Sequence, residues 1–256
     1  MTSIRYKNNN LFVENVSVKR LTTKYGSPFY LYSNENIVKN YLTFYRNFKK
    51  TSPLICFSVK ANSNNQILKI LKKLGSGADV VSVGELLKVL RSGIKPNKIV
   101  FSGVGKTEEE LKIAIKKNIL LINVESENEA TLINKISGKM KKKVSIGVRL
   151  NPDISAPTHK KISTGKAEDK FGLSEKNLIS FCQNVHKLKN IKLEGISVHI
   201  GSQILSENPF KKTLKVLENI ILKTKIRFKF VDLGGGFGIT YRKEDKKIKL
   251  ADYARL

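Results

Sequence analysis

The chain has only two cysteines, no tryptophan and no long apolar run. Cys56 and Cys182 provide neither a disulfide framework nor a metal-ligand spacing. No apolar run reaches the roughly 18 residues that cross a membrane, and residues 1–18 lack the apolar stretch of a secretory signal. We therefore expect a globular protein of a reducing cytoplasm, with no metal site and no membrane partner.

Acidic residues are also scarce. The chain has 21 Asp and Glu against 48 Lys and Arg, which gives a net charge of +27. Such a charge is typical of proteins that bind nucleic acids or anionic membranes, but a lysine-rich proteome produces it on solvated surfaces too. Lysine outnumbers arginine and is spread along nearly every segment, whereas nucleic-acid readers favour arginine and cluster their charge. We expect no nucleic-acid partner; a salt-dependent affinity for DNA would indicate one.

From about residue 50 the chain repeats a short β-rich apolar run, an amphipathic helix and a turn. Strands that alternate with helices are typical of a parallel sheet covered by helices. Capping boxes at Thr107/Glu110 and Ser126/Glu129 mark two helix starts. The predicted strands span residues 54–59, 78–83, 98–101, 120–124, 144–150, 193–199 and 228–233. The predicted helices span 65–74, 85–91, 175–188 and 209–223, with two more that begin at 107 and 126.

Seven strand–helix units fit two α/β architectures, an open doubly wound sheet or a TIM-type (β/α)8 barrel. We favour the barrel, without its last strand, because the closing segment predicts only the start of a helix. The first 33 residues do not share the repeat; they predict strands at 11–18 and 28–32 around a helix at 17–25. The expected domains are 1–33, a segment of a β-domain whose partner strands are missing, and 34–256, a barrel truncated at its C-terminal end.

Lys60 closes the first predicted strand, in the run FSVKAN. The carboxyl ends of the strands form the active-site mouth of a parallel barrel. An amine that is removed from water there becomes a nucleophile toward aldehydes. In so lysine-rich a chain, however, position alone would favour a solvated lysine at a strand end. Other motifs must decide between a nucleophilic and a solvated Lys60.

A glycine-rich turn, DLGGGFG at residues 232–238, directly follows the seventh predicted strand. Its glycines permit a tight turn whose N–H groups face an anion, and barrels commonly bind phosphate after their seventh and eighth strands. The alternative is a flexible turn. A Rossmann fingerprint would belong to the first strand–helix turn. The run 102–107 is no Walker loop, because Val100 stands where the leading glycine should be.

A third motif, HIGSQI at residues 199–204, follows the sixth predicted strand. An imidazole at this place can stack on a planar cofactor, and the Ser202 hydroxyl can bind a phosphate. A lone histidine is nevertheless more often structural. We expect that role for His186, which lies on an amphipathic helix, whereas His159 lies in a long polar loop and allows either role.

Three further runs accompany these motifs: ADVVSVGE (78–85), VRLNP (148–152) and ISTG…DKFGL (162–173). In this order, and over nearly the whole chain, they resemble the fold-type III pyridoxal-phosphate-dependent decarboxylases. Ornithine and arginine decarboxylases share the lysine, the histidine and the triple glycine. The combination of ISTG…DKFGL with HIGSQ is similar to the diaminopimelate decarboxylase branch.

The resemblance implies pyridoxal 5′-phosphate as cofactor, with Lys60 and His199 as catalytic residues. Lys60 would bind the cofactor covalently and His199 would stack on its ring. The phosphate would be held by Ser202, Gly234, Gly235 and Gly236. Three charged residues match family positions around the cofactor, although each also suits a charge network at a barrel mouth: Asp79, Glu85 and Arg149.

The resemblance also implies a reaction, the decarboxylation of meso-2,6-diaminopimelate to L-lysine in the last step of lysine biosynthesis. The enzyme would be a cytoplasmic homodimer with shared active sites. A decarboxylase of ornithine, arginine or carboxynorspermidine, or a non-catalytic pyridoxal-phosphate-binding homologue, is the alternative. Family members also have a Glu-Pro-Gly-Arg segment and a C-terminal β-domain that donates a cysteine and a tyrosine to the partner. None of these is in the sequence, so we expect an incomplete enzyme with weak or absent turnover.

Overall fold

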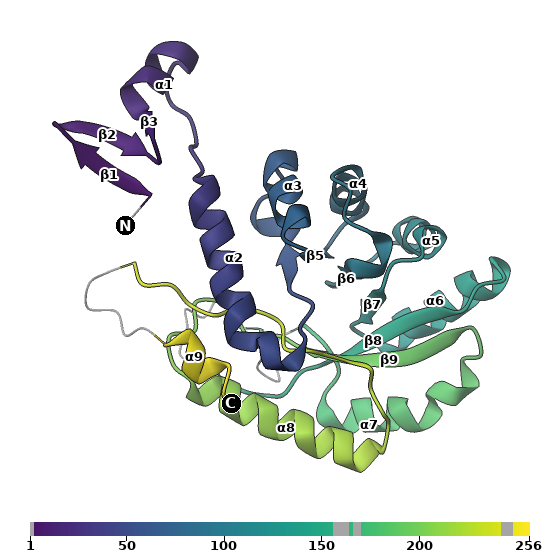
Figure 1. The fold of residues 1–256 in the computed structure, drawn as a ribbon. Coiled ribbons are helices and arrows are strands. Elements are labelled where there is room, and N and C mark those ends of the chain that lie inside the picture. The colour runs from purple at the N-terminus through teal and green to yellow at the C-terminus, as the bar shows by residue number, and fades with distance from the viewer. Residues whose placement is uncertain (1–2, 156–163, 166–169, 242–247) are drawn as a thin grey trace.

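Seven parallel strands form one curled sheet in a computed structural model that describes residues 3–155, 164–165, 170–241 and 248–256 (Figure 1). His159 lies outside the described residues. The order is β10-β9-β8-β7-β6-β5-β4. The strands are β4 (Cys56–Ser58), β5 (Gly77–Val80), β6 (Ile99–Phe101), β7 (Leu121–Val124), β8 (Val144–Leu150), β9 (Ile191–Val198) and β10 (Phe230–Asp232).

The sheet order decides between the two predicted architectures. Every strand pairs with its neighbour in the sequence, and each of the six pairs is parallel. A doubly wound sheet would reverse its order at a switch point, and this one does not. The seven-stranded, barrel-type α/β fold is therefore confirmed.

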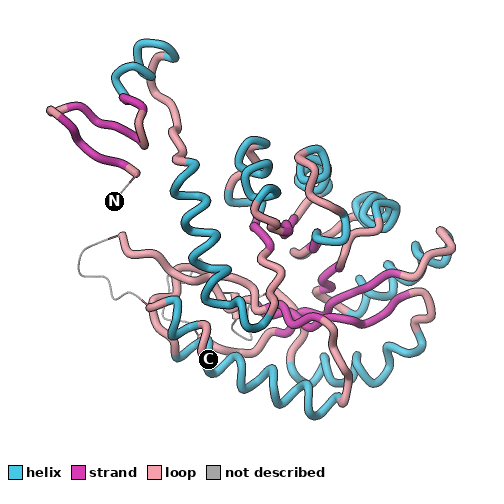
Figure 2. Tube along the Cα trace, in the orientation of Figure 1, coloured by secondary structure: helices cyan, strands magenta, loops and turns pink. Residues whose placement is uncertain are grey.

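Helices cover the outer face of the curled sheet (Figures 1 and 2). Their apolar stripes recur every three to four residues, and the buried members pack against the strands, as Leu68, Leu86, Leu111 and Ile133 do. The helices are α2 (Asn34–Phe48), α3 (Asn65–Lys73), α4 (Val83–Arg91), α5 (Glu108–Lys117), α6 (Glu127–Lys139), α7 (Glu175–Asn184), α8 (Asn208–Thr224) and α9 (Leu250–Tyr253). Short 3-10 helices are η1 (Lys49–Thr51), η2 (Val59–Ala61), η3 (Pro96–Lys98) and η5 (Val185–Lys187).

The predicted elements of the repeat are all present, with shifted ends. Strand β8 has the predicted bounds, whereas β4 and β10 are shorter than predicted. The predicted helix 175–188 ends at Asn184 and continues as η5. Helix α2 was not predicted, because its position before the first strand falls outside the repeat.

The N-terminal segment forms its own antiparallel sheet, β1 (Ile4–Lys7), β2 (Asn10–Val13) and β3 (Val16–Ser17), followed by α1 (Val18–Tyr25). Asn8 and Asn9 have φ of 47° and 57°, as a two-residue hairpin turn requires. The predicted strand 11–18 is broken because Glu14, at φ 54°, makes a second tight turn. The predicted strand 28–32 was wrong: this run has no regular secondary structure and is exposed. Pro28, its first residue, has no N–H to donate to a strand neighbour.

An aromatic cluster joins α2, α8 and α9 to the segment after β10. The Tyr253 ring lies 4.6 Å from Phe210 of α8, 5.6 Å from Phe48 of α2 and 5.5 Å from Phe237, measured between ring centroids. Helices α2 and α8 precede β4 and β10, the two edge strands of the sheet. The cluster therefore links the elements that flank the two edges of the curled sheet.

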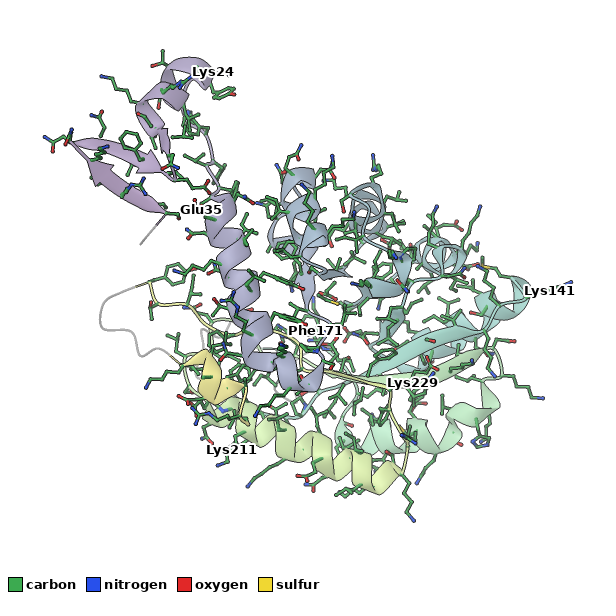
Figure 3. All side chains as sticks on the ribbon, viewed as in Figure 1. Lys24, Glu35, Lys141, Phe171, Lys211 and Lys229 are labelled. Carbon is green, nitrogen blue, oxygen red and sulfur yellow. The ribbon has the colours of Figure 1, made fainter. Side chains whose placement is uncertain are left out.

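The positive charge is dispersed over the fold. Lys24, Lys141, Lys211 and Lys229 lie on widely separated parts of the molecule (Figure 3). Among the described helices, none has the length and apolar character that a membrane crossing requires.

Of the two predicted capping boxes, one is complete. Thr107 Oγ1 accepts a hydrogen bond from Glu110 N–H, and Glu110 Oε2 accepts one from Thr107 N–H at 3.1 Å. Ser126 likewise accepts from Glu129 N–H. The Glu129 carboxylate, however, accepts from Glu125 N–H instead of Ser126 N–H and pairs with Lys106. The second box is therefore only half formed, because the buried ammonium recruits its carboxylate.

The complete capping box generates a stability prediction. Thr107→Ala should lower the free energy of unfolding by about 1 kcal/mol, because the Glu110 N–H at the start of α5 loses its acceptor. Thr131→Ala is the matched control: Thr131 is an exposed residue inside α6 whose hydroxyl donates to Glu127 O. The control should be neutral or slightly stabilising. Urea denaturation of both variants checks this, and equal effects would contradict it.

Candidate active site

Three of the predicted motifs meet at one rim of the sheet. Lys60 follows β4, His199 follows β9, and the glycine turn 234–236 follows β10. Because all seven strands are parallel, their carboxyl ends form the same edge. The curl of the sheet then brings its two edge strands toward each other (Figure 1).

The sequence predicted Lys60 directly after a strand ending at residue 59, whereas one residue separates it from the strand in the structure. Strand β4 ends at Ser58, and Lys60 is the middle residue of η2. Its side chain is exposed, so the predicted removal of this amine from water was wrong for this structure. Its positive charge is a minor influence on two rim residues: it opposes the upward shift of the Asp79 pKa that burial causes, and it adds to the downward shift of the His199 pKa.

The loops after β9 and β10 are hydrogen-bonded to each other. Ile204 N–H donates to Gly236 O at 2.8 Å, and Gly238 N–H donates to Ile204 O at 2.9 Å. A Cβ on Gly234 would collide with Val198 O, and one on Gly236 would collide with Gly201 O. Their positive φ values, 67° and 90°, also favour glycine. A Cβ on Gly235, in contrast, would meet no heavy atom within 4 Å, so the middle of the turn faces open space.

His199 bridges the two loops as a neutral ring. Its Nδ1 accepts a hydrogen bond from Gly235 N–H at 3.2 Å, which places the proton of the neutral imidazole on Nε2. Burial lowers the pKa of His199 to about 4, and the charges of Arg149 and Lys60 act in the same direction. The imidazole is therefore uncharged at neutral pH, with one defined tautomer.

The pKa of Asp79, near the end of β5, is shifted upward, whereas that of His199 is shifted downward. Burial raises the pKa of its carboxyl to about 6, and the neighbouring carboxylate of Asp232 adds to the increase. Hydrogen bonds from Ser102 and Ser58 and the charge of Lys60 oppose the shift. The rim thus holds a carboxyl group that changes its charge in mildly acidic solution.

Arg149, near the end of β8, is buried, and its guanidinium contacts a carboxylate, a backbone carbonyl and an aromatic ring. Its guanidinium pairs with Glu125 at 2.8 Å and donates to His199 O at 3.4 Å. Glu125 also accepts from Gly172 N–H at 2.8 Å, and the guanidinium lies 4.7 Å from the Phe171 ring. Arg149 therefore orders the backbone around His199 and residues 171–172.

Three other predicted residues occupy less specific places. Glu85 lies at the start of α4, where its carboxylate accepts a hydrogen bond from Val81 N–H at 2.9 Å. Ser202 is exposed in the loop that follows His199. His186 lies on η5, before β9 and hence at the opposite end of the strands, and its Nδ1 is 2.8 Å from Gln183 O.

The polar residues that support this rim from below were not predicted from the sequence. Asn123 on β7 donates to Asp232 at the end of β10 at 3.1 Å, across the interior of the curled sheet. Glu125 follows the same strand. A polar residue inside the apolar run LLINV was the available signal, since strands covered on both faces are otherwise nearly continuous apolar runs.

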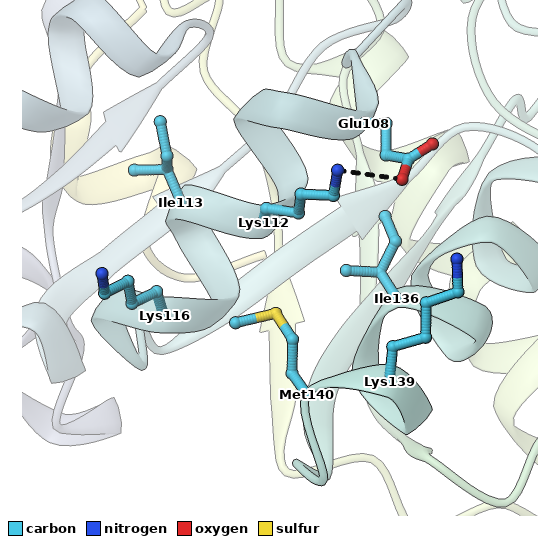
Figure 4. A pocket seen from close by; sticks show the side chains of 7 residues that line it. All are labelled: Glu108, Lys112, Ile113, Lys116, Ile136, Lys139 and Met140. Carbon is cyan, nitrogen blue, oxygen red and sulfur yellow. Dashed lines mark ion pairs between the residues drawn. The ribbon is translucent and has the colours of Figure 1, made fainter.

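A hollow of about 350 Å³ lies elsewhere, on the outer surface between α5 and α6 (Figure 4). Ile113, Ile136 and Met140 line it together with lysine stems. None of the predicted site residues lines it. We therefore locate the candidate site at the rim of the sheet.

The rim fits the cofactor that the sequence resemblance implies. Pyridoxal phosphate needs an amine for its aldehyde, a flat partner for its ring and a cradle for its phosphate. The rim has an amine at Lys60, a neutral ring at His199 and an open stretch of backbone at Gly235. The Cβ clashes at Gly234 and Gly236 show that the cradle depends on glycine.

The buried environment of His199 predicts an unusual titration. Its imidazole should remain neutral until the pH falls to about 4. Because the folded pKa lies below the reference value of 6.5, His199 stabilises the fold fully above that pH and loses this contribution as the pH falls toward 4. NMR of the ring resonances, assigned with His199→Gln, measures the midpoint. A midpoint near 6.5 would contradict the buried, tautomer-locked ring.

Comparisons with a family model and with curated relatives point to the same family. The family model for the pyridoxal-binding domain of pyridoxal-dependent decarboxylases matches residues 34–256. A diaminopimelate decarboxylase of Aquifex aeolicus is 41% identical over 99% of this chain and 60% of that protein. The chain spans about 60% of the length of the curated relatives that it matches.

Solved structures agree in fold. Diaminopimelate decarboxylase from Helicobacter pylori, complexed with L-lysine, superposes with a TM-score of 0.87 at 41% identity, over 93% of this chain and 61% of that one. The enzyme from M. jannaschii, also in complex with L-lysine, gives 0.91 at 33% identity, over 100% and 62%. This chain belongs to the pyridoxal-dependent decarboxylase family, of which it contains the pyridoxal-binding domain.

Proposed function

We propose that this chain is the cofactor-binding part of an enzyme that decarboxylates meso-2,6-diaminopimelate to L-lysine and CO2. The observation that carries the proposal is the meeting of Lys60, His199 and the glycine turn at one rim. Relatives of this name are 36–43% identical to the chain, and two of their structures hold L-lysine. L-lysine is the product of the proposed reaction, which supports the substrate class.

The proposed roles of the residues follow from their places at the rim. Lys60 presents the amine that joins the cofactor aldehyde, and His199 presents a neutral ring face. Ser202 and the turn of Gly234, Gly235 and Gly236 hold the phosphate. Asp79, Glu85 and Arg149 complete the charged surroundings. All three also have partners within the chain.

The chemistry divides between the cofactor and the chain. When bound, pyridoxal phosphate withdraws the electron pair that departing CO2 leaves at the α-carbon of an amino acid. The chain binds and orients. A neutral His199 adds no second positive charge beside Lys60, and the Arg149–Glu125 pair fixes the backbone at His199. Prepositioned groups of this kind lower the barrier, since they need not reorganise during the reaction.

We also propose the organisation of the whole enzyme. Residues 1–33 form the N-terminal segment of a β-domain and residues 34–256 the barrel, in agreement with the start of the family match at residue 34. The enzyme is a cytoplasmic homodimer whose active sites are shared between subunits. Analytical ultracentrifugation of the full-length protein would test the dimer.

Cofactor attachment is the first test. The chain mixed with pyridoxal phosphate should develop a visible absorption band. Borohydride should remove this band and leave the cofactor irreversibly attached to the chain, and Lys60→Ala should abolish both the band and the attachment. Lys176→Ala is the matched control, because Lys176 is an exposed lysine on the outer helix α7. In so lysine-rich a chain, an equal band in wild type and Lys60→Ala would indicate unspecific labelling and contradict the proposed role of Lys60.

Substrate choice is the second test, and it requires the full-length protein. CO2 release should be faster from meso-2,6-diaminopimelate than from ornithine or arginine by at least about tenfold, since a site that binds a distal amino-acid group leaves polar groups unpaired when that group is absent. Faster release from ornithine or arginine would place the enzyme in another branch of the family.

A further inference from the structure

A chain of hydrogen bonds crosses the interior of the curled sheet just below the rim. Ser58 Oγ donates to Asp79 Oδ2 at 3.4 Å, and the Ser102 hydroxyl lowers the pKa of the Asp79 carboxyl against the effect of burial. Asn123 Nδ2 donates to Ser102 Oγ at 3.2 Å and to Asp232 Oδ2 at 3.1 Å. Hydrogen bonds thus join β4 to β5 and, through Asn123 of β7, the loop after β6 to β10, the opposite edge strand.

These hydrogen bonds continue from Asp232 into the glycine turn. Asp232 Oδ1 accepts a hydrogen bond from Gly234 N–H at 2.8 Å, and the next N–H, of Gly235, donates to His199 Nδ1. One oxygen of Asp232 is therefore held by Asn123 and the other holds the turn. The direction of the Asp232 carboxylate decides where the Gly234 peptide lies.

The Asn123 side chain is buried with its amide nitrogen bonded, whereas its Oδ1 has no hydrogen-bond partner in the described part of the chain. The residue is 2% exposed, and its amide nitrogen donates to two acceptors. Its Oδ1 packs on Gly147 of the neighbouring strand, where a Cβ would collide with it. The absence of a side chain at Gly147 leaves the room that the amide fills.

Charge explains why an amide is needed between the two acids. Asp79 and Asp232 are close enough for one to affect the ionisation of the other, so a third carboxylate between them would add repulsion. Asn123 supplies N–H groups toward both sides, directly to Asp232 and through the Ser102 hydroxyl to Asp79. A buried carboxylate that loses such a donor is left with an unpaired charge, which is costly.

We propose that Asn123 is a positioning residue for the cofactor phosphate: through Asp232 it fixes the glycine turn from the far side of the barrel interior. The inference rests on the proposed function, because it assigns the turn of Gly234 to Gly236 to the phosphate. Asn123 acts only through Asp232. Its loss therefore weakens cofactor binding while Lys60 and His199 stay unchanged.

A reciprocal exchange tests the proposal on the 256-residue chain. Asn123→Asp places two carboxylates face to face, and Asp232→Asn places an amide against an amide. Each should weaken the equilibrium affinity for pyridoxal phosphate about tenfold, the effect of leaving a buried polar group unsatisfied. The double variant Asn123→Asp/Asp232→Asn restores an amide–carboxylate pair with the two groups exchanged. The amide oxygen introduced at position 232 can still accept from Gly234 N–H, so the double variant should regain most of the lost affinity.

Ser197→Ala is the matched control. Ser197 lies beside Asp232 in the register of β9 and β10, and its hydroxyl is buried without a partner among the described residues. This variant removes a buried hydroxyl at the same level but outside the series of hydrogen bonds, so its affinity should change less than about twofold. Circular dichroism melts check that each variant is folded.

Amide hydrogen exchange at Gly234, measured without cofactor, reports directly on the hydrogen bond that holds the glycine turn to Asp232. Both single variants should exchange faster there than wild type, and the double variant should regain protection. Unchanged exchange at Gly234 in the single variants, or a folded double variant that binds no better than the weaker single variant, would overturn the proposal. Wild-type chain that fails to bind pyridoxal phosphate would instead contradict the proposed function, so the two failures are distinguishable.

Discussion

The site depends on one constraint, the parallel pairing of seven strands in sequential order. Parallel strands place all their carboxyl ends on one edge, and sequential order with helices outside makes the sheet curl rather than reverse. Residues as distant in sequence as Lys60 and Gly235 thereby face the same space. A sheet with the same strands but a reversed order would send the edge strands apart, and no single cofactor could reach both groups.

At the rim of this sheet, the surroundings shift the pKa values of ionisable side chains in opposite directions. His199 is kept neutral by burial beside two cations, while burial and a neighbouring acid push Asp79 toward its neutral form. Arg149 is instead fully paired with Glu125. Buried charge is tolerated only with partners, which explains why so many polar side chains of the rim bond to one another or to backbone.

Much of the fold could be predicted because its signals are local. Apolar runs and capping residues such as Thr107 specify elements from a few neighbouring residues, and the glycine turn stands out by composition. The strand 28–32 was predicted wrongly because its β-rich composition says nothing about whether a pairing partner is available. The open choice between two sheet architectures had the same origin, since strand order is a long-range property.

The supporting layer of the site was harder to predict for that reason too: Asn123 and Asp232 are 109 positions apart, and only the curl of the sheet makes them partners. Lys60 was recognised from its motif, and its exposure on η2 agrees with the solvated strand-end lysine that its position alone favoured.

The central claim is that Lys60 and the glycine turn serve one ligand. A crystal structure of the chain grown with pyridoxal phosphate tests it most directly. We predict electron density continuous from Lys60 Nζ to the cofactor, with the phosphate against the backbone of Gly234, Gly235 and Gly236 and the His199 ring over its face. A cofactor joined to another lysine, or a phosphate bound away from the glycine turn, would contradict it.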